Sequence, residues 1–182
     1  MSERVGCGAP GSRRIEVLRA DIATLDADAI VNAANEALAP GGGVCGAIHR
    51  AAGPALAEAC RKLAPCPTGE ARVTPGFGLK ARWVIHAVGP VWRGGGAGEE
   101  ALLAACYRHA LAAADEAGAR SIAFPAISTG IYGFPVERAA PIAARAVMQE
   151  WPNRPHLQRV LFACFSEHDR ASYAAAAKST GA

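Results

Sequence analysis

Two glycine-bearing loops combine residue types that suit the binding of an anion. One contains Gly41-Gly42-Gly43 and leads into a helical pattern near Val44, and the other reads STGIYG over residues 128–133. Each follows a predicted buried strand and precedes a predicted helix. Glycine lets main-chain N–H groups reach a ligand with no Cβ in the way, and a helix N-terminus gathers unpaired N–H groups at its positive end. Because loops at the carboxyl ends of strands converge in an open α/β sheet, we expect the two loops to hold one diphosphate together.

The spacing of these glycines argues against other well-known motifs. Gly41, Gly43 and Gly46 match GxGxxG, but that motif follows its strand directly, whereas seven residues, 35–41, come after Ala34 here. The chain has no GxxxxGKS or GxxxxGKT run and no GxSxG run, which excludes a P-loop and weakens a serine hydrolase assignment. A glycine run between strand and helix can also serve only as a turn, and for one loop alone that alternative stays open.

Alternating strand-like and helix-like segments place these loops in an α/β layer architecture. The predicted strands are residues 15–18, 29–34, 71–74, 83–88, 121–127 and 160–165. Helical patterns follow near Val44, after Gly53-Pro54, from Glu99 to Gly118, after Pro135 and over residues 167–178. Pro141 leaves open whether the helix after Pro135 begins there or is kinked there. Runs 83–88 and 121–127 are apolar on both faces, so we expect them in the centre of a sheet with helices on both sides.

Composition bounds the class of protein. A chain of 182 residues with 51% hydrophobic and 19% charged residues predicts a single domain over 14–182, preceded by a flexible tail over 1–13. No apolar run reaches the roughly 20 residues of a membrane span, and no leader core is present, which favours the cytoplasm. The six cysteines have no CxxC or metal-ligand spacing, so we expect reduced thiols, no metal and no cofactor. A net charge of +3 with scattered basic residues makes nucleic-acid binding an unfavoured role.

Four segments together resemble the macrodomain family, most closely its MacroD-type branch of ADP-ribose ester and ADP-ribosyl hydrolases. They read ADIATLDADAIVNAANEALAPGGGVCGAIHRAAG, TGEARV, WVIHAVGPVW and FPAISTGIYGFP, and they occur in the family's order between residues 15 and 172. The resemblance implies a three-layer α/β/α sandwich with a central mixed sheet of about six strands. It also implies that ADP-ribose, or an ester of it, lies across the top with its diphosphate between the two loops.

Position by position, the resemblance implies a role for individual residues. Asp21 accepts from the adenine amino group, with the Ile22 backbone nearby, although Asp21 can equally cap the turn DIATL. Asn35 orients the distal ribose and the attacked bond, its alternative being a turn asparagine, while Asn32 braces the loop from within its strand. Tyr132 covers the distal ribose and Phe165 stacks on adenine, the alternative for both being core packing. The implied ligand set is Asp21, Ile22, Asn35, Gly42, Gly43, Val44, Ser128, Thr129, Gly130, Ile131, Tyr132 and Phe165.

Cys45 departs from the family pattern. Hydrolytic bacterial and animal members of this branch usually carry aspartate at this place, in GVDGAIH, and the aspartate is proposed to activate or position water. A thiol with a reference pKa of about 8.5 is a poorer proton acceptor at neutral pH than a carboxylate. Alphavirus macrodomains also carry GVC and belong to the hydrolytic set. A further hypothesis is that Cys45 acts as a nucleophile, with His49 on the same face of the helix. The alternative is that His49 is an ordinary buried histidine with its hydrogen bonds satisfied.

The sequence therefore predicts a hydrolase, with Asn35 and Cys45 as candidate catalytic residues. Its reactions are deacetylation of O-acetyl-ADP-ribose and removal of mono-ADP-ribose from acidic side chains of modified proteins. The runner-up is a reader module that binds ADP-ribose with little or no turnover, because Cys45 replaces the usual aspartate. A structural α/β domain without affinity for ADP-ribose is a third class.

Overall fold

The strands form one six-stranded sheet in the computed structural model, which describes residues 13–181. Their spatial order is β1-β6-β5-β2-β4-β3, and only the edge pair β3 and β4 is antiparallel. The strands are β1 (Arg14–Arg19), β2 (Ala29–Ala34), β3 (Ala71–Pro75), β4 (Trp83–Val88), β5 (Ser121–Phe124) and β6 (Arg159–Cys164). The runs predicted to lie inside the sheet, β4 and β5, are both interior strands, as expected from their apolar faces.

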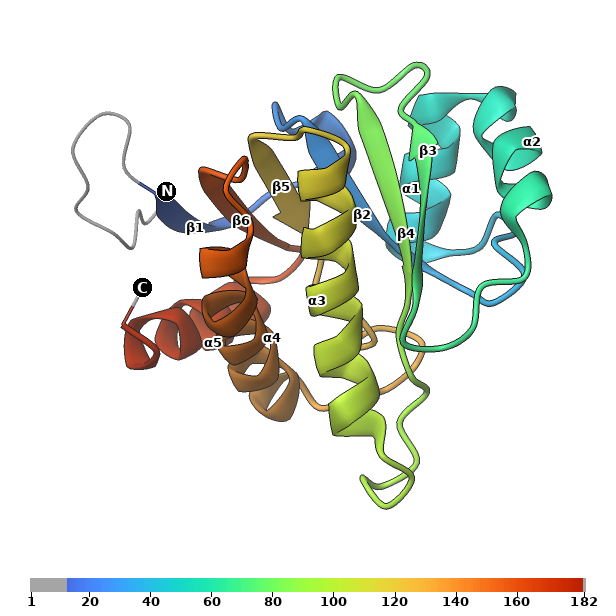
Figure 1. The fold of residues 1–182 in the computed structure, drawn as a ribbon. Helices are drawn as coiled ribbons and strands as arrows, with labels where there is room; N and C mark the ends of the chain where they lie inside the picture. The colour runs from blue at the N-terminus through green and yellow to red at the C-terminus, as the bar shows by residue number, and fades with distance from the viewer. Residues whose placement is uncertain (1–12, 182) are drawn as a thin grey trace.

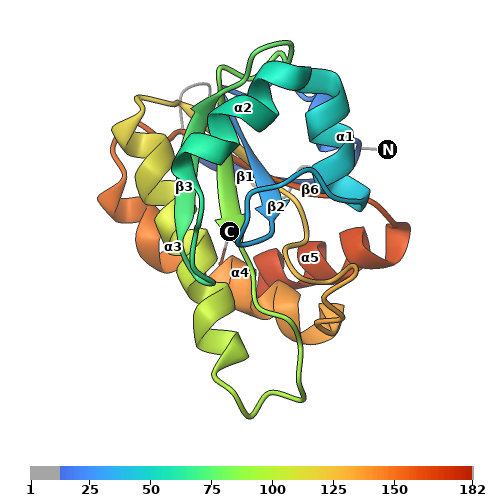
Figure 2. The same cartoon turned by 90° about the vertical axis from the view of Figure 1, so that its right-hand side faces the viewer.

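Helices cover both faces of the sheet (Figures 1 and 2). On one face lie α1 (Gly43–Ala52), α2 (Pro54–Leu63) and the short 3-10 helix η1 (Ile22–Thr24), packed on one apolar cluster. On the other face lie α3 (Glu99–Glu116), α4 (Val136–Glu150), the 3-10 turn η2 (Trp151–Asn153) and α5 (Glu167–Ser179). The predicted three-layer α/β/α fold with a mixed sheet is confirmed. No helix within residues 13–181 is both long enough and apolar enough to cross a bilayer.

Several boundaries differ from the predicted ones for local reasons. β5 ends at Phe124 rather than at residue 127, because Pro125 follows and proline has no N–H for the ladder. β6 ends at Cys164, which leaves Phe165 outside the sheet. α4 begins at Val136 and contains Pro141 in its second turn, which excludes a helix that begins at Pro141. Of the predicted tail, residues 1–12 lie outside the described part, while Arg13 donates to the carbonyls of Trp151 and Arg154 at 2.9 and 3.0 Å.

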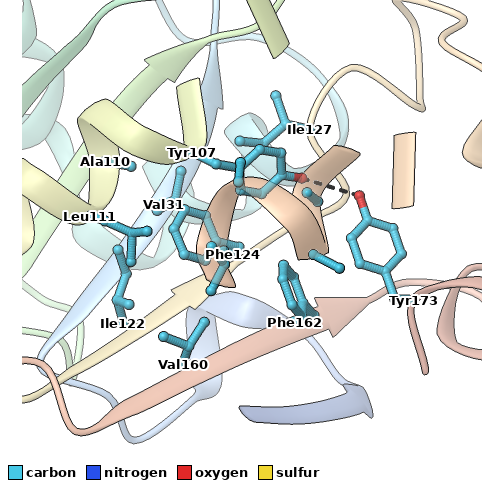
Figure 3. Packing of buried hydrophobic residues seen from close by; sticks show 14 of the residues in the cluster. Val31, Tyr107, Ala110, Leu111, Ile122, Phe124, Ile127, Val160, Phe162 and Tyr173 are labelled. Carbon is cyan, nitrogen blue, oxygen red and sulfur yellow. Dashed lines mark hydrogen bonds between the residues drawn. The ribbon is translucent and has the colours of Figure 1, made fainter. Parts of the chain in front are cut away.

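Aromatic side chains fill the core between the sheet and the helices α3, α4 and α5 (Figure 3). Tyr107 packs against Phe124 with ring centroids 5.0 Å apart, and Phe162 packs against Tyr173 at 5.1 Å. The buried hydroxyls of Tyr107 and Tyr173 share a hydrogen bond of 3.1 Å, which satisfies both polar tips inside an apolar layer. This core holds β5 and β6 in place beneath the loops that follow them.

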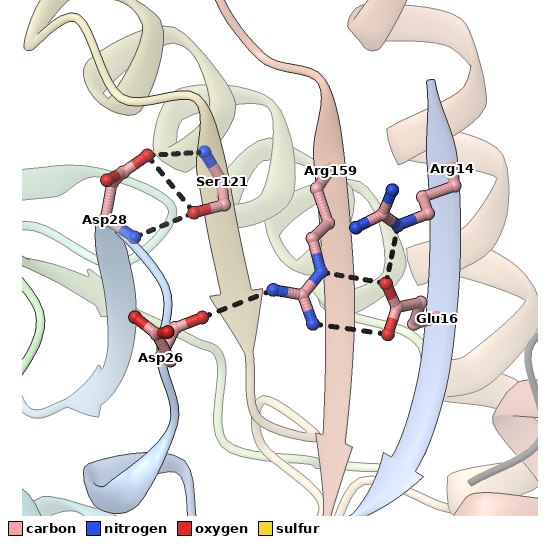
Figure 4. Close-up of polar contacts among 6 residues, drawn as sticks. All are labelled: Arg14, Glu16, Asp26, Asp28, Ser121 and Arg159. Carbon is pink, nitrogen blue, oxygen red and sulfur yellow. Dashed lines mark hydrogen bonds and ion pairs between the residues drawn. The ribbon is translucent and has the colours of Figure 1, made fainter. Parts of the chain in front are cut away.

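A polar cluster ties together the amino ends of four strands (Figure 4). Arg159 pairs with Glu16 through two hydrogen bonds of 2.8 and 3.2 Å, and Asp28 accepts from the N–H and hydroxyl of Ser121. The hydrogen bond from Arg159 is the main reason that the pKa of Glu16 lies below its usual value. These bonds join the amino ends of β1, β6 and β5 and the start of β2 at one end of the sheet. The loops that follow these strands lie at the other end, beyond their carboxyl ends.

Candidate functional site

The two glycine-bearing loops open into one shared cavity. They follow β2 and β5, which are neighbours in the sheet, so their carboxyl ends lie side by side. The cavity measures about 330 Å³. Its lining residues are Ala33, Ala34, Asn35, Gly41, Gly42, Gly43, Val44, Cys45, Gly89, Pro125, Ala126, Ile127, Ser128, Gly130, Ile131 and Tyr132. The two loops therefore converge, as predicted from the sequence.

Unpaired main-chain N–H groups face this cavity from both loops. The first hydrogen bond of α1 runs from Gly46 N–H to Gly42 O at 3.2 Å, so the N–H groups of residues 43–45 precede it. In the other loop, Thr129 N–H bonds to Ala126 O and Gly133 N–H bonds to Gly130 O. The N–H groups in between, of residues 130–132, have no partner within residues 13–181. Since no Asp, Glu, Lys, Arg or His is among the described lining residues, main-chain dipoles set the polarity of the cavity and favour an anion.

Two glycines make the close approaches that shape this cavity. A Cβ at Gly46 would lie 2.6 Å from Gly41 O, so only glycine lets α1 pack so tightly against its own loop. A Cβ at Gly89, directly after β4, would lie 2.2 Å from Ser128 Oγ and 2.6 Å from Ile127 Cγ2. Gly46, the last glycine of the apparent GxGxxG spacing, thus serves the packing of α1 on its own loop. Ile131 reaches across from the opposite loop, with its Cδ1 3.6 Å from where a Cβ of Gly42 would stand.

Ser128 combines backbone strain with an unsatisfied hydroxyl. Its φ of +66° lies in the left-handed region that residues other than glycine seldom adopt. The side chain is buried, and its Oγ has no hydrogen-bond partner within the described part of the chain. A strained residue that leaves a donor unsatisfied beside a cavity is typical of a ligand site.

Asn35 uses its side chain to hold the first loop. Its Nδ2 donates to Ala39 O at 3.0 Å, and its Oδ1 accepts from Ala39 N–H at 3.1 Å. The contacts of a turn asparagine are therefore present. A primary amide has two N–H groups and two acceptor lone pairs, so one of each remains for a ligand in the cavity. The two roles that the sequence left as alternatives are geometrically compatible.

Cys45 lies in the first turn of α1 and lines the cavity, although only 6% of it is exposed. Its thiol contacts Ala39 O and the Nδ2 atom of Asn32, each at 3.7 Å. Asn32 also contacts His86 Nδ1 at 3.1 Å. Within residues 13–181 the side-chain partners of Asn32 are Cys45 Sγ, in the first turn of α1, and His86 Nδ1, so the expectation that Asn32 braces the loop itself needs correcting.

His49 is buried on α1, and burial lowers its pKa. The expectation of a satisfied histidine is wrong in one respect, because its Nε2 has no partner within residues 13–181. No hydrogen bond joins Cys45 to His49 in this part of the chain, so the pairing needed for a nucleophilic thiol is not formed. The five described cysteines are free thiols, as predicted, while Cys7 lies outside the described residues. No three His, Cys, Asp or Glu side chains of the described chain are grouped to hold a metal ion.

A protein-family model described as "Macro domain" matches residues 31–143, more than half of the sequence. The chain belongs to the macro domain family. This macrodomain is 60% identical over 159 residues to a macro domain-containing protein of Ralstonia nicotianae, which covers 87% of this chain and 91% of the relative. It is 52% identical over 162 residues to a Klebsiella pneumoniae protein named O-acetyl-ADP-ribose deacetylase, with coverage of 87% and 93%.

A solved macrodomain of Oceanobacillus iheyensis with ADP superposes on this macrodomain with a TM-score of 0.90. The two are 39% identical, and the match covers 99% of this chain and 96% of that one. A variant of the same Oceanobacillus protein was solved with ADPR, at a TM-score of 0.90, 38% identity and coverage of 99% and 98%. The family resemblance read from the sequence is confirmed.

Four predicted ligand residues of the macrodomain lie outside the 330 Å³ cavity. Asp21 is exposed and caps η1 by accepting from Ala23 N–H at 3.0 Å, while Ile22 is buried. Phe165 is 86% exposed, which rules out core packing as its role. Asp21 and Phe165 follow the paired strands β1 and β6, so both come at the carboxyl end of the same strand pair. Thr129 turns its hydroxyl to Ala126 O at 2.9 Å and does not line the cavity.

Several residues that line the cavity of the macrodomain were not predicted from the sequence. Gly89 follows β4, and residues 125–127 continue from β5. The signal for Gly89 was its place directly after a predicted interior strand, next to a proline. The signal for residues 125–127 was Pro125, which ends β5 and turns the following segment into the loop.

Proposed function

We propose that this macrodomain binds ADP-ribose and hydrolyses ester-linked ADP-ribose. Its reactions are the deacetylation of O-acetyl-ADP-ribose and the release of mono-ADP-ribose from acidic side chains of modified proteins. The observation that carries the proposal is that two loops with unpaired N–H groups share one cavity, and that no charged side chain is among its described lining residues. The Klebsiella relative named for the first reaction supports the chemistry, and the Oceanobacillus structures with ADP and ADPR support the ligand.

In this proposal the diphosphate occupies the space between residues 42–45 and residues 130–132. Their N–H groups provide hydrogen bonds to the phosphate oxygens, which requires no cationic side chain. The buried hydroxyl of Ser128 gains the partner that it lacks within the described chain. We assign the adenine to Phe165 and Asp21, at the β1 and β6 end, and the distal ribose to Tyr132 at the other end.

The chemical step is the attack of water on an ester. For O-acetyl-ADP-ribose, water attacks the acyl carbon, the ester C–O bond breaks, and acetate and ADP-ribose leave. For a modified acidic side chain, water attacks either the acyl or the anomeric carbon. Both routes release the free carboxylate side chain and ADP-ribose. Asn35 retains one N–H and one lone pair to orient the distal ribose and the scissile bond, and Cys45 borders the same space. No carboxylate lines the described cavity, so the ligand's own phosphate and the loop N–H groups position the water.

One observation favours a reader module as the second candidate function. The side chain that lines the cavity in the first turn of α1 is the Cys45 thiol. By the family resemblance, hydrolytic bacterial and animal members of the MacroD type usually carry aspartate at this position. Without a carboxylate to hold the water, ADP-ribose would bind and no product would form.

Product release from O-acetyl-ADP-ribose at catalytic enzyme concentration separates these functions. We expect many turnovers per protein molecule, in the presence of EDTA as well, and faster turnover in Cys45→Asp if a carboxylate improves water positioning. Stoichiometric binding of ADP-ribose in a calorimetric titration, without turnover in the wild type, would establish the reader instead. No calorimetric affinity for ADP-ribose would refute both functions. Arg145→Ala, at an exposed position on α4 away from the cavity, is the control for Cys45→Asp.

A further inference from the structure

Two polar side chains interrupt the apolar layer between the sheet and the helices α1 and α2. Asn32 on β2 and His86 on β4 are register partners and are 1% and 0% exposed. The positions two residues away on both strands, on the same face of the sheet, carry buried apolar side chains. Burying an amide beside an imidazole costs free energy unless their polar atoms are paired, so this pair needs an explanation beyond packing.

The pair belongs to a chain of contacts that runs from β3 to the cavity. Thr74 Oγ1 lies 2.9 Å from His86 Nε2, and Asn32 Nδ2 lies 3.1 Å from His86 Nδ1. The same Nδ2 atom lies 3.7 Å from Cys45 Sγ. Burial lowers the pKa of His86 to about 4, so the ring is neutral at physiological pH and one of its nitrogens is an acceptor.

These contacts fix the direction of each hydrogen bond. Because Asn32 Nδ2 can only donate, His86 Nδ1 accepts and Nε2–H donates to the hydroxyl oxygen of Thr74. The second N–H of the amide then points to the Cys45 sulfur. Asn32 Oδ1 is buried without a partner within residues 13–181, so the donor end of the amide, and not its oxygen, determines its orientation.

We propose that His86 is a positioning residue that selects which end of the Asn32 amide faces Cys45. In the opposite ring tautomer, Nδ1–H would attract Oδ1, and the amide would present an oxygen to the sulfur. An N–H donor stabilises negative charge on sulfur, whereas an acceptor favours the protonated thiol. The inference rests on the proposed function, in which Cys45 borders the space of the scissile bond, and it extends the site to His86 on β4, whose described residues 83–88 do not line the cavity.

The test is the rate at which iodoacetamide alkylates Cys45 in the full-length folded protein, followed by mass spectrometry of the peptide that contains Cys45. His86→Gln removes the acceptor at the Nδ1 position, and His86→Asn keeps one there. We expect alkylation of Cys45 to slow roughly 10-fold in His86→Gln. The Asn32 amide is then no longer held with its N–H toward Cys45, and the hydrogen bond from that N–H to the reacting thiolate is lost. His86→Asn should alkylate within about twofold of the wild-type rate, given that its side-chain oxygen replaces the acceptor.

Two further variants keep the inference testable. Cys60 touches the same ring, with Sγ 3.6 Å from Nε2 and 3.9 Å from Nδ1, so Cys60→Ala perturbs the same layer without removing the acceptor for Asn32. Cys60→Ala should alkylate Cys45 at the wild-type rate. Thr74→Val removes only the bond to Nε2, and it should slow alkylation several-fold even if His86→Gln does not fold.

Equal slowing in Cys60→Ala and Thr74→Val would overturn the inference, because a general loosening of the layer would then explain the result. Wild-type alkylation rates in both His86→Gln and Thr74→Val would overturn it as well. The assay contains no substrate, so a wild type without turnover would refute the proposed hydrolase while the alkylation rates still decided the role of His86.

Discussion

Gly89→Ala uses a single methyl group to test how the segment after β4 packs against the loop after β5. The added Cβ would stand 2.2 Å from Ser128 Oγ and 2.6 Å from Ile127 Cγ2, well inside van der Waals contact. The Ser128 hydroxyl can rotate away, but Ile127 is 0% exposed, so we expect the loop after β5 to shift. Overpacking of this kind costs about 1–3 kcal/mol, and ~2 kcal/mol lowers the melting temperature of a domain this size by ~6 °C.

The displaced loop carries the N–H groups of residues 130–132, so affinity for ADP-ribose should fall with stability. We expect a Kd for ADP-ribose at least about tenfold higher in calorimetric titration, because hydrogen bonds to phosphate need close alignment. Urea unfolding monitored by circular dichroism gives the stability change. Gly96→Ala is the matched control, since a Cβ there meets nothing within 4 Å and its φ is not positive. It should change the free energy of unfolding by less than about 0.5 kcal/mol.

A second-site change locates the clash. Ser128→Gly removes both Ser128 atoms that would crowd the new methyl group, and glycine suits the φ of +66° at that position. In the Gly89→Ala background it should recover about 1 kcal/mol, which a double-mutant cycle measures as coupling. Equal unfolding free energies for Gly89→Ala and Gly96→Ala, with unchanged affinity, would refute the packing described here.

Three further predictions concern ionisation, the anion cradle and the core. Burial lowers the pKa of His86 from 6.5 to about 4, so the ring must stay neutral in the folded protein. The free energy of unfolding should be highest above pH 6.5 and should fall by about 3 kcal/mol as the pH drops toward 4. Urea unfolding across this range measures the decline, which should be shallower in His86→Asn. Gly43→Glu should abolish ADP-ribose binding in calorimetry, since a carboxylate enters the cradle, and its φ of +56° adds about 1 kcal/mol of strain. Gly118→Glu is the control, because Gly118 has a φ of +72° and open space away from the cavity. It should lower the free energy of unfolding by a similar amount and should bind ADP-ribose normally. Tyr107→Phe should lower the free energy of unfolding by about 1–3 kcal/mol, because the buried hydroxyl of Tyr173 loses its partner, and Tyr107→Phe/Tyr173→Phe should recover most of it.

The sequence by itself determined the order of the elements and the loops that carry the site. Strand periodicity located all six strands to within a few residues, and Gly41 to Gly43 and the STGIYG run marked both loops. These signals are local, because an alternating or helical period and a bare backbone are properties of neighbouring residues. The Cys45 departure was likewise visible in the sequence, as was the family to which the chain belongs.

Only the tertiary structure decided how distant segments meet. The Asn32 to His86 contact depends on the register of β2 with β4, and the Gly89 to Ser128 approach joins the ends of two strands that are not adjacent in the sheet. The exposure of Phe165 likewise depends on where β6 ends. No local pattern encodes these contacts, because side chains far apart in sequence are brought together only when the helices and the sheet pack and fix the strand order.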